Sequence, residues 1–245
     1  MLFLVIERQI HVAPAPDSLA RDAAARVLAA AADSIAAKGT FSIALSGGST
    51  PKALYALLAS DEFKSQTDWS HWDIYWGDER CVGPDDKESN YKMANDALLT
   101  KVPVKKENIH RMKGEYDPNA AAREYGQLLQ SKFADGGLDL ILLGMGPDGH
   151  TLSLFPGSAA LNETHHRCVA NWVEKFKTFR ITMTAPFANK ARQIMVLVAG
   201  ADKRDRVTEV LEGPHDPQRL PIQFIDPAPN GGRLVWLMDA EAAGM

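Results

Sequence analysis

The sequence predicts a single α/β domain, a doubly wound, Rossmann-like fold in which a mostly parallel sheet is covered by helices on both faces. Short runs of mainly apolar residues, such as FSIAL (41–45) and LDLILLG (138–144), are typical of strands buried on both sides. They alternate along the chain with helix-periodic segments, so repeated strand–helix–strand units are expected.

The first long helix has clear start and stop signals. The alanine-rich segment 18–38 is expected to begin after Asp17 as the N-cap and to end at Gly39. The other expected helices cover 52–59, 89–99, 119–133 and about 202–211. Strands are expected at 1–6, 41–45, 72–76, 138–144, 179–184, 194–200 and 234–238.

Composition narrows the class of protein further. The 245 residues show no internal repeat or linker, so one domain over 1–245 is expected. A net charge of −4, without a basic block, disfavours a nucleic-acid or membrane surface. The two cysteines do not form a disulfide framework, and the apolar start of the chain lacks a basic signal-peptide region, so a cytoplasmic protein is expected.

In a sheet of this kind, ligands bind at the carboxyl ends of the strands. The first motif there is LSGGSTP (45–51), between an expected strand and helix. The glycines allow a tight turn, and the amides and hydroxyls at the helix start, from Ser46, Gly47, Gly48, Ser49 and Thr50, can cradle a phosphate. The alternative is an ordinary strand–helix turn with a serine or threonine cap.

Cations follow three of the expected strands or lie within them. Arg80 lies in WGDERCV (76–82), beside carboxylates that could orient it on an anion; a solvated loop with a surface ion pair is the alternative. Arg180 lies in FRITMT, and Lys203 starts a helix, where the helix dipole disfavours a cation unless both share an anion. The alternative for Lys203 is an ordinary surface lysine.

The segment GMGPDGH (144–150) ends a buried strand with three glycines and one histidine. Positive φ values at Gly144, Gly146 and Gly149 would allow a sharp turn that presents His150, with Asp148 two residues before it. Such a histidine can act as a general base, or it can bond the carbonyls of its own turn. No metal-ligand spacing, cofactor fingerprint or GxSxG serine is present in the sequence, so neither metal nor cofactor nor covalent nucleophile is predicted.

Three segments together, SGGSTP, WGDERCVGPDDKESNY and LLGMGPDGHTLSLFPGS, resemble the glucosamine-6-phosphate isomerase/6-phosphogluconolactonase family, with RITMT and AGADK extending the match. The resemblance implies a lactone hydrolase acting on 6-phosphogluconolactone in the oxidative pentose phosphate pathway. It implies that His150 activates water and that Asp148 orients the imidazole. The residues Ser46–Thr50, Arg180 and Lys203 would hold the 6-phosphate, with Arg80 as a further cation.

The resemblance leaves two other functions to be considered. A deaminase of the same family is expected to carry a catalytic glutamate after the histidine, whereas 151–155 contain no acid. A sugar-phosphate sensor of a transcriptional regulator would add a DNA-binding segment, for which the sequence offers neither length nor charge. The expected partner is therefore a small-molecule substrate, without nucleic acid or membrane, and the chain is expected to be a monomer or a weak homo-oligomer.

Overall fold

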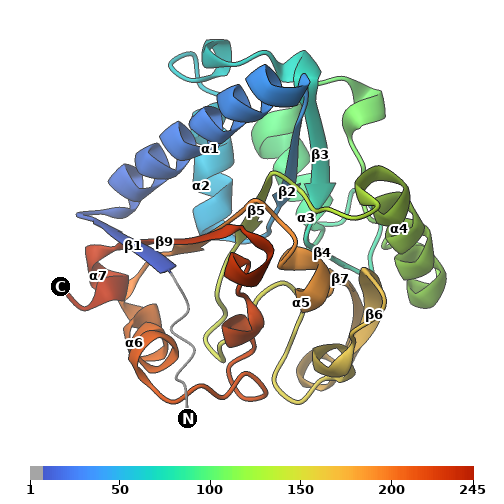
Figure 1. Ribbon diagram of the computed structural model, residues 1–245, viewed down its shortest axis with the longest axis vertical. Coiled ribbons are helices and arrows are strands. Elements are labelled where there is room, and N and C mark those ends of the chain that lie inside the picture. Colours follow the sequence, from blue (N-terminus) through green and yellow to red (C-terminus); the bar gives the residue numbers. More distant parts are fainter. Residues whose placement is uncertain (1–7) are drawn as a thin grey trace.

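The computed structural model describes residues 8–245 and confirms the doubly wound α/β fold. Its main sheet has six strands in the order β1-β9-β8-β5-β2-β3, and every neighbouring pair is parallel (Figure 1). The strands are β1 (Arg8–Ala13), β2 (Phe41–Leu45), β3 (Trp72–Trp76), β5 (Leu140–Leu143), β8 (Gln193–Val198) and β9 (Arg233–Asp239). The strand expected at 1–6 lies outside the described residues.

Helices cover the sheet on both faces because the chain reverses its direction across the sheet. It runs from β1 to β2 and on to β3, then returns to β5, β8 and β9 on the other side of β2. Right-handed crossovers place the outgoing helices α1 (Pro16–Lys38) and α2 (Ser49–Leu58) on one face, where they pack together, and the returning connections on the other. The remaining helices are α3 (Asn90–Ala94), a π-helical turn (Asn95–Leu99), α4 (Pro118–Phe133), α5 (Ala185–Ala188), α6 (Arg204–Glu212) and α7 (Ala240–Ala243).

A second, antiparallel sheet of three strands lies beside the main one, in the order β4-β7-β6. Its strands are β4 (Asp78–Arg80), β6 (Cys168–Val173) and β7 (Thr178–Met183). The strand expected at 179–184 therefore exists, but it is not part of the parallel sheet. The short connection between β6 and β7 is the reason, since neighbouring parallel strands need a crossover of a dozen or more residues.

Two helix starts differ from expectation. The N-cap of α1 is Ala15 rather than Asp17, because Pro16 occupies the first helical position, which suits its fixed φ. Ser18 completes the cap by bonding both backbone groups of Ala15. Gly39 ends the helix with a φ of 80°, as predicted. Helix α2 begins at Ser49, three residues before the expected start at Lys52.

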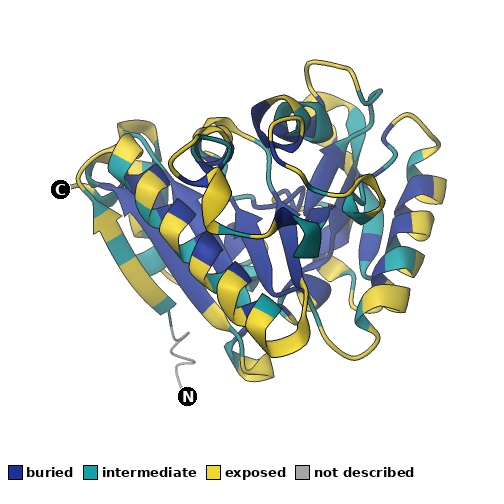
Figure 2. Ribbon diagram, turned by 90° about the horizontal axis from the view of Figure 1, so that it is seen from above, coloured by how far each residue is buried: buried dark blue, intermediate teal, exposed yellow. Residues whose placement is uncertain are grey.

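The core lies between the sheet and its helices, and Figure 2 shows the central strands buried beneath α1. β2 and β5 are buried along their whole length, which is why β5 is entirely apolar and β2 is apolar except for Ser42, whose hydroxyl is paired with Asp139. Within the described part of the chain, no helix has the length and apolar character needed to cross a bilayer. The strand ends, by contrast, carry polar residues, and the reversal between β2 and β5 opens a crevice at their carboxyl edge.

Candidate active site

A cleft of about 750 Å³ lies at the carboxyl ends of β2, β3, β5 and β8. Nine of the ten residues singled out from the sequence line it: Ser46, Gly47, Gly48, Ser49, Thr50, Arg80, His150, Arg180 and Lys203. The tenth, Asp148, contacts the imidazole of His150 from outside the lining. Residues from five separate segments of the chain are thus brought to one place.

The loop between β2 and α2 brings backbone donors to the cleft. Gly48 has a φ of 105°, a conformation that other residues rarely adopt, and helix α2 begins immediately after it. A Cβ on Gly47 would lie 2.0 Å from Oδ1 of Asn90, so no larger residue fits there. No side chain of residues 8–245 caps α2, and its first amides at Ser49 and Thr50 remain available to an anion.

Arg80 and Arg180 face each other as register partners on the antiparallel strands β4 and β7. Burial lowers the pKa of Arg180, and the nearby charge of Arg80 lowers it further. Like charges directly opposite each other on a sheet are destabilising, so an anion in the cleft would relieve this pair. Lys203 adds a third cation, and its Nζ lies 3.2 Å from a carboxylate oxygen of Asp202.

The carboxylates next to Arg80 do not orient its guanidinium, contrary to the hypothesis drawn from the sequence. Glu79 is 2% exposed and accepts hydrogen bonds from the backbone amides of Arg80, Asn90 and Tyr91. It therefore joins β4 to the start of α3. The Arg80 guanidinium instead donates to the backbone carbonyl of Glu88.

The glycine turn after β5 presents His150, but only one of its glycines has the expected conformation. Gly149 has a φ of 78°, whereas Gly144 and Gly146 do not have positive φ values, so that part of the prediction was wrong. Gly146 is needed for another reason, because a Cβ there would lie 2.0 Å from the His150 ring. The amides of Gly146 and Gly149 bond carbonyls within the turn, so neither is available to a substrate oxyanion.

His150 and Asp148 form a hydrogen-bonded pair through Nδ1 and Oδ1. Burial opposes ionisation of Asp148, but the hydrogen bond and charge of His150 and the charge of Lys175 outweigh it and hold the pKa of Asp148 well below its ordinary value. An ionised Asp148 selects the tautomer with the proton on Nδ1 and leaves Nε2 as an acceptor. Phe155 stacks on the ring at 4.1 Å between centroids and restricts its orientation.

Sequence reasoning missed two polar residues of the cleft, Asn90 and Ser153, which hold Asp78. Asn90 donates Nδ2 to the carbonyl of Asp78 at 2.9 Å, and the Ser153 hydroxyl donates to the Asp78 carboxylate at 2.6 Å. This network ties β4 to α3 and to the segment after His150. The signal in the sequence was weak, because nothing in the local pattern distinguishes Asn90 or Ser153 from a surface polar residue.

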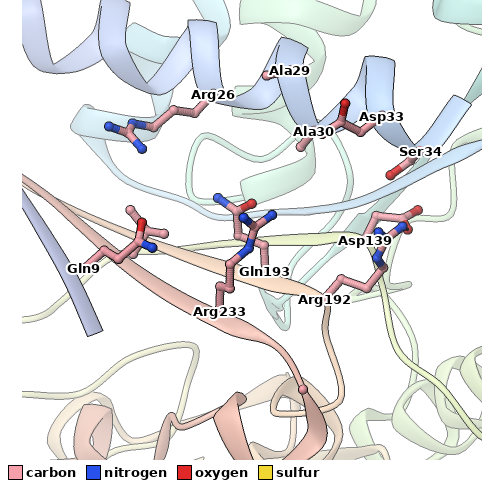
Figure 3. A pocket seen from close by; sticks show the side chains of 12 residues that line it. Gln9, Arg26, Ala29, Ala30, Asp33, Ser34, Asp139, Arg192, Gln193 and Arg233 are labelled. Carbon is pink, nitrogen blue, oxygen red and sulfur yellow. The ribbon is translucent and has the colours of Figure 1, made fainter. Parts of the chain in front are cut away.

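A second cleft, of about 330 Å³, lies between α1 and the amino-terminal ends of the strands (Figure 3). Its charged groups largely pair with protein groups: Asp139 accepts hydrogen bonds from Ser42, and Arg26 pairs with Asp22 at 2.8 Å. Its lining contains neither histidine nor cysteine. The cleft with His150 is therefore the candidate active site.

A doubly wound sheet with clustered cations and a histidine–aspartate pair at its carboxyl edge is the arrangement of an α/β enzyme for a small molecule. The chain belongs to the family described as glucosamine-6-phosphate isomerases/6-phosphogluconolactonase, whose model matches residues 14–236. It is similar to the 6-phosphogluconolactonase of Nostoc sp., with 38% identity over 97% of this chain and 98% of the relative. The corresponding protein of Synechocystis sp. is 41% identical over 85% of each chain. The 6-phosphogluconolactonase structure from Trypanosoma cruzi superimposes with a TM-score of 0.85 at 27% identity, covering 98% of this chain and 97% of the other.

Proposed function

We propose that this chain hydrolyses 6-phospho-D-glucono-1,5-lactone to 6-phospho-D-gluconate, with His150 as the general base. As a member of its family with lactonase relatives along its whole length, the chain is a lactone hydrolase. The observation that carries the assignment of the base is the position of His150, which lines the cleft while its Nδ1–H donates a hydrogen bond to Asp148 outside the lining.

The phosphate of the substrate binds among the cations and the start of α2. Arg180 and Lys203 supply charge, and the loop from Ser46 to Thr50 supplies backbone amides and hydroxyls. Arg80, opposite Arg180, is a further cation at the substrate. Anchoring at the phosphate positions the lactone carbonyl, so that binding energy remote from C1 serves the reaction.

Hydrolysis then needs one base and one water. Nε2 of His150 removes a proton from water, whose oxygen forms a bond to C1 of the lactone. The tetrahedral oxyanion collapses, the bond from C1 to the ring oxygen breaks, and the imidazolium returns its proton to that oxygen. Because the amides of Gly146 and Gly149 are engaged within the turn, they are not the donors that stabilise the oxyanion.

Glucosamine-6-phosphate deamination is the alternative within the family. It is disfavoured by the segment after His150, where 151–155 carry no acid. The first acid beyond them, Glu163, is not in the lining of the cleft and accepts hydrogen bonds from His165 and His166. Of the acids that do line it, Asp78 is held by Ser153 and Asn90.

We place the reaction in the cytoplasm, in keeping with the free thiols Cys81 and Cys168.

The test is an assay of lactone loss at slightly acidic pH, with the lactone made in situ, run beside a deaminase assay on glucosamine 6-phosphate. The wild-type chain is expected to hydrolyse the lactone and to leave the amino sugar unchanged. His150→Ala is expected to lower kcat/KM by about 10² to 10⁴, the usual worth of a general base. The control is His215→Ala, which removes an exposed histidine outside the cleft.

Three results would contradict the proposal. Ammonia release from glucosamine 6-phosphate would indicate the deaminase. A wild-type rate in His150→Ala would remove the histidine from its role as the base. Equal turnover of glucono-1,5-lactone without the phosphate would mean that the cations do not anchor a phosphate.

A further inference from the structure

The tip of the hairpin between β6 and β7 reaches the histidine–aspartate pair. The tip consists of a short 3₁₀ turn, Glu174–Phe176, followed by Lys177. Nζ of Lys175 lies 3.3 Å from Oδ2 of Asp148, while Oδ1 of the same carboxylate bonds Nδ1 of His150. One carboxylate is therefore shared between the imidazole of the glycine turn and an ammonium from a separate sheet.

The same tip also contacts the imidazole indirectly, through two aromatic rings. Phe176 packs edge-to-face on Phe155 at 5.8 Å between centroids, and Phe155 stacks on His150. The tip is itself held in place by Trp172, whose Nε1 donates a hydrogen bond to the Glu174 carboxylate at 2.8 Å. The anchored tip thus holds Lys175 next to Asp148, although the Lys175 side chain is 55% exposed.

Lys175 is not part of the lining of the cleft. Phe176 and Arg180 from the same hairpin do line it. The hairpin therefore contributes some residues to the cleft, while Lys175 contacts the base from outside the cleft. A substrate in the cleft would meet Arg180, whereas Nζ of Lys175 contacts the Asp148 carboxylate and lies 5.5 Å from the centroid of the Phe176 ring. Its effect on catalysis must then pass through Asp148 or through the aromatic rings that pack on His150.

Several other charged groups lie near His150 and Asp148, and their contacts differ from that of Lys175. On α6, Arg206 donates Nε to the carbonyl of Pro147 at 2.9 Å and pairs with Glu209. The charged residues in the lining of the cleft are Asp78, Arg80, Glu88, Arg180, Asp202 and Lys203. Among the contacts of the described residues, Lys175 is the cation that touches the Asp148 carboxylate itself besides His150.

We propose that Lys175 is a positioning residue for the base, an inference that rests on the proposed function. It holds the Asp148 carboxylate ionised and turned so that Oδ1 faces His150. Its positive charge also offsets part of the attraction between the Asp148 carboxylate and a protonated imidazole. The hairpin therefore acts on the base from outside the cleft, while Arg180 on the same hairpin binds the substrate.

The experiment compares Lys175→Met, Lys175→Arg and the matched control Lys177→Met, which removes a cation from the same tip without a contact to Asp148. Two quantities are measured: the NMR titration of the His150 ring in the free protein, assigned with His150→Ala, and the pH profile of lactone hydrolysis. In Lys175→Met, both the His150 titration and the acidic limb of kcat/KM are expected to move upward by about half a pH unit, as for one charge lost at close range in partly aqueous surroundings.

The kinetic constants separate positioning from substrate binding. In Lys175→Met, kcat on the plateau is expected to fall by about three- to tenfold through looser orientation of the base, with KM unchanged. Lys175→Arg should restore both the midpoint and the rate, and Lys177→Met should match the wild type. Thermal unfolding of each variant checks that the fold is intact.

Three outcomes would overturn the role of Lys175, and one would separate that role from the proposed function. An unshifted His150 titration in Lys175→Met overturns the inference, as does an equal shift in Lys177→Met, which would indicate general surface charge. A raised KM with unchanged kcat would make Lys175 a ligand of the substrate instead. If Lys175→Met shifts the His150 titration but the wild-type protein hydrolyses no lactone, the coupling of Lys175 to His150 stands and the proposed function fails.

Discussion

At the scale of single residues, the pairing of Arg80 with Arg180 indicates most about the ligand. The two lie opposite each other across β4 and β7, and burial and mutual repulsion both lower the pKa of Arg180. Such a pair is stabilised when a dianion lies between the cations and accepts charge-assisted hydrogen bonds. The two guanidinium groups thus form a cationic pair at the cleft of a chain whose net charge is −4.

The consequence for kinetics is a change in KM. Arg180→Ala and Lys203→Ala are each expected to raise KM for the phosphorylated lactone by about 10- to 100-fold, the worth of one hydrogen bond to a charged group, with a much smaller change in kcat. Steady-state kinetics would test this, with Lys190→Ala, an exposed lysine outside the cleft, as the control. A lower kcat at unchanged KM would place these cations at the reacting carbonyl instead.

At the scale of elements, the cleft depends on how β4 is joined to α3. The carboxylate of Glu79 accepts three backbone amides and the hydroxyl of Ser89, at distances of 2.7 to 3.0 Å. Burial raises the pKa of Glu79, and the four donors act against that shift. The contact holds the start of α3 against β4, and with it Asn90 beneath Gly47.

Replacing this carboxylate should therefore destabilise the whole chain. In Glu79→Gln, the NH₂ group of the new side chain would face the backbone amides that now donate to the carboxylate, so some of these donors would lose their partner. The expected loss in the free energy of unfolding is about 1–3 kcal/mol, the cost of leaving buried polar groups unpaired. Urea unfolding measures the change, with the exposed Glu107→Gln as the control. Equal stability of Glu79→Gln and the wild type would show that these hydrogen bonds contribute nothing net.

At the scale of the whole molecule, stability in acid depends on carboxylates that are hydrogen-bonded in the fold. Glu163 has its pKa lowered to about 2 from 4.5, chiefly by the amides of His166 and His165, and that of Asp148 is lowered as well. A lowered folded-state pKa means that the stabilisation is fully present above the unfolded value. It is lost as the pH falls through the folded value.

For Glu163 the window lies between about pH 4.5 and about pH 2. Glu163→Gln keeps an acceptor for the two amides but removes the charge, so it is expected to be less stable than the wild type near neutral pH. The difference in unfolding free energy should shrink toward zero as the pH approaches the lower end of that window. Urea unfolding at a series of pH values measures this. A difference that stays constant down to that limit would contradict the assignment.

Much of the fold follows from local patterns. The buried strands β2 and β5 are predominantly apolar because helices cover both of their faces, and that pattern is visible without the structure. The Ser46–Thr50 loop and the His150 turn were predicted because glycine and polar residues after a buried strand carry their own physical explanation. The N-cap of α1 was misplaced because a proline at the first helical position outweighed the local preference for Asp17.

What the sequence determined by itself is the set of elements and the residues with chemistry at the strand ends, since both depend on local periodicity, turn conformation and side-chain type. Tertiary structure alone decided which of these residues meet. It placed Arg80 opposite Arg180, moved β7 out of the parallel sheet, and brought Lys175 to Asp148. These contacts join segments far apart in the chain, and their free energy comes from packing and pairing that no short stretch of sequence contains.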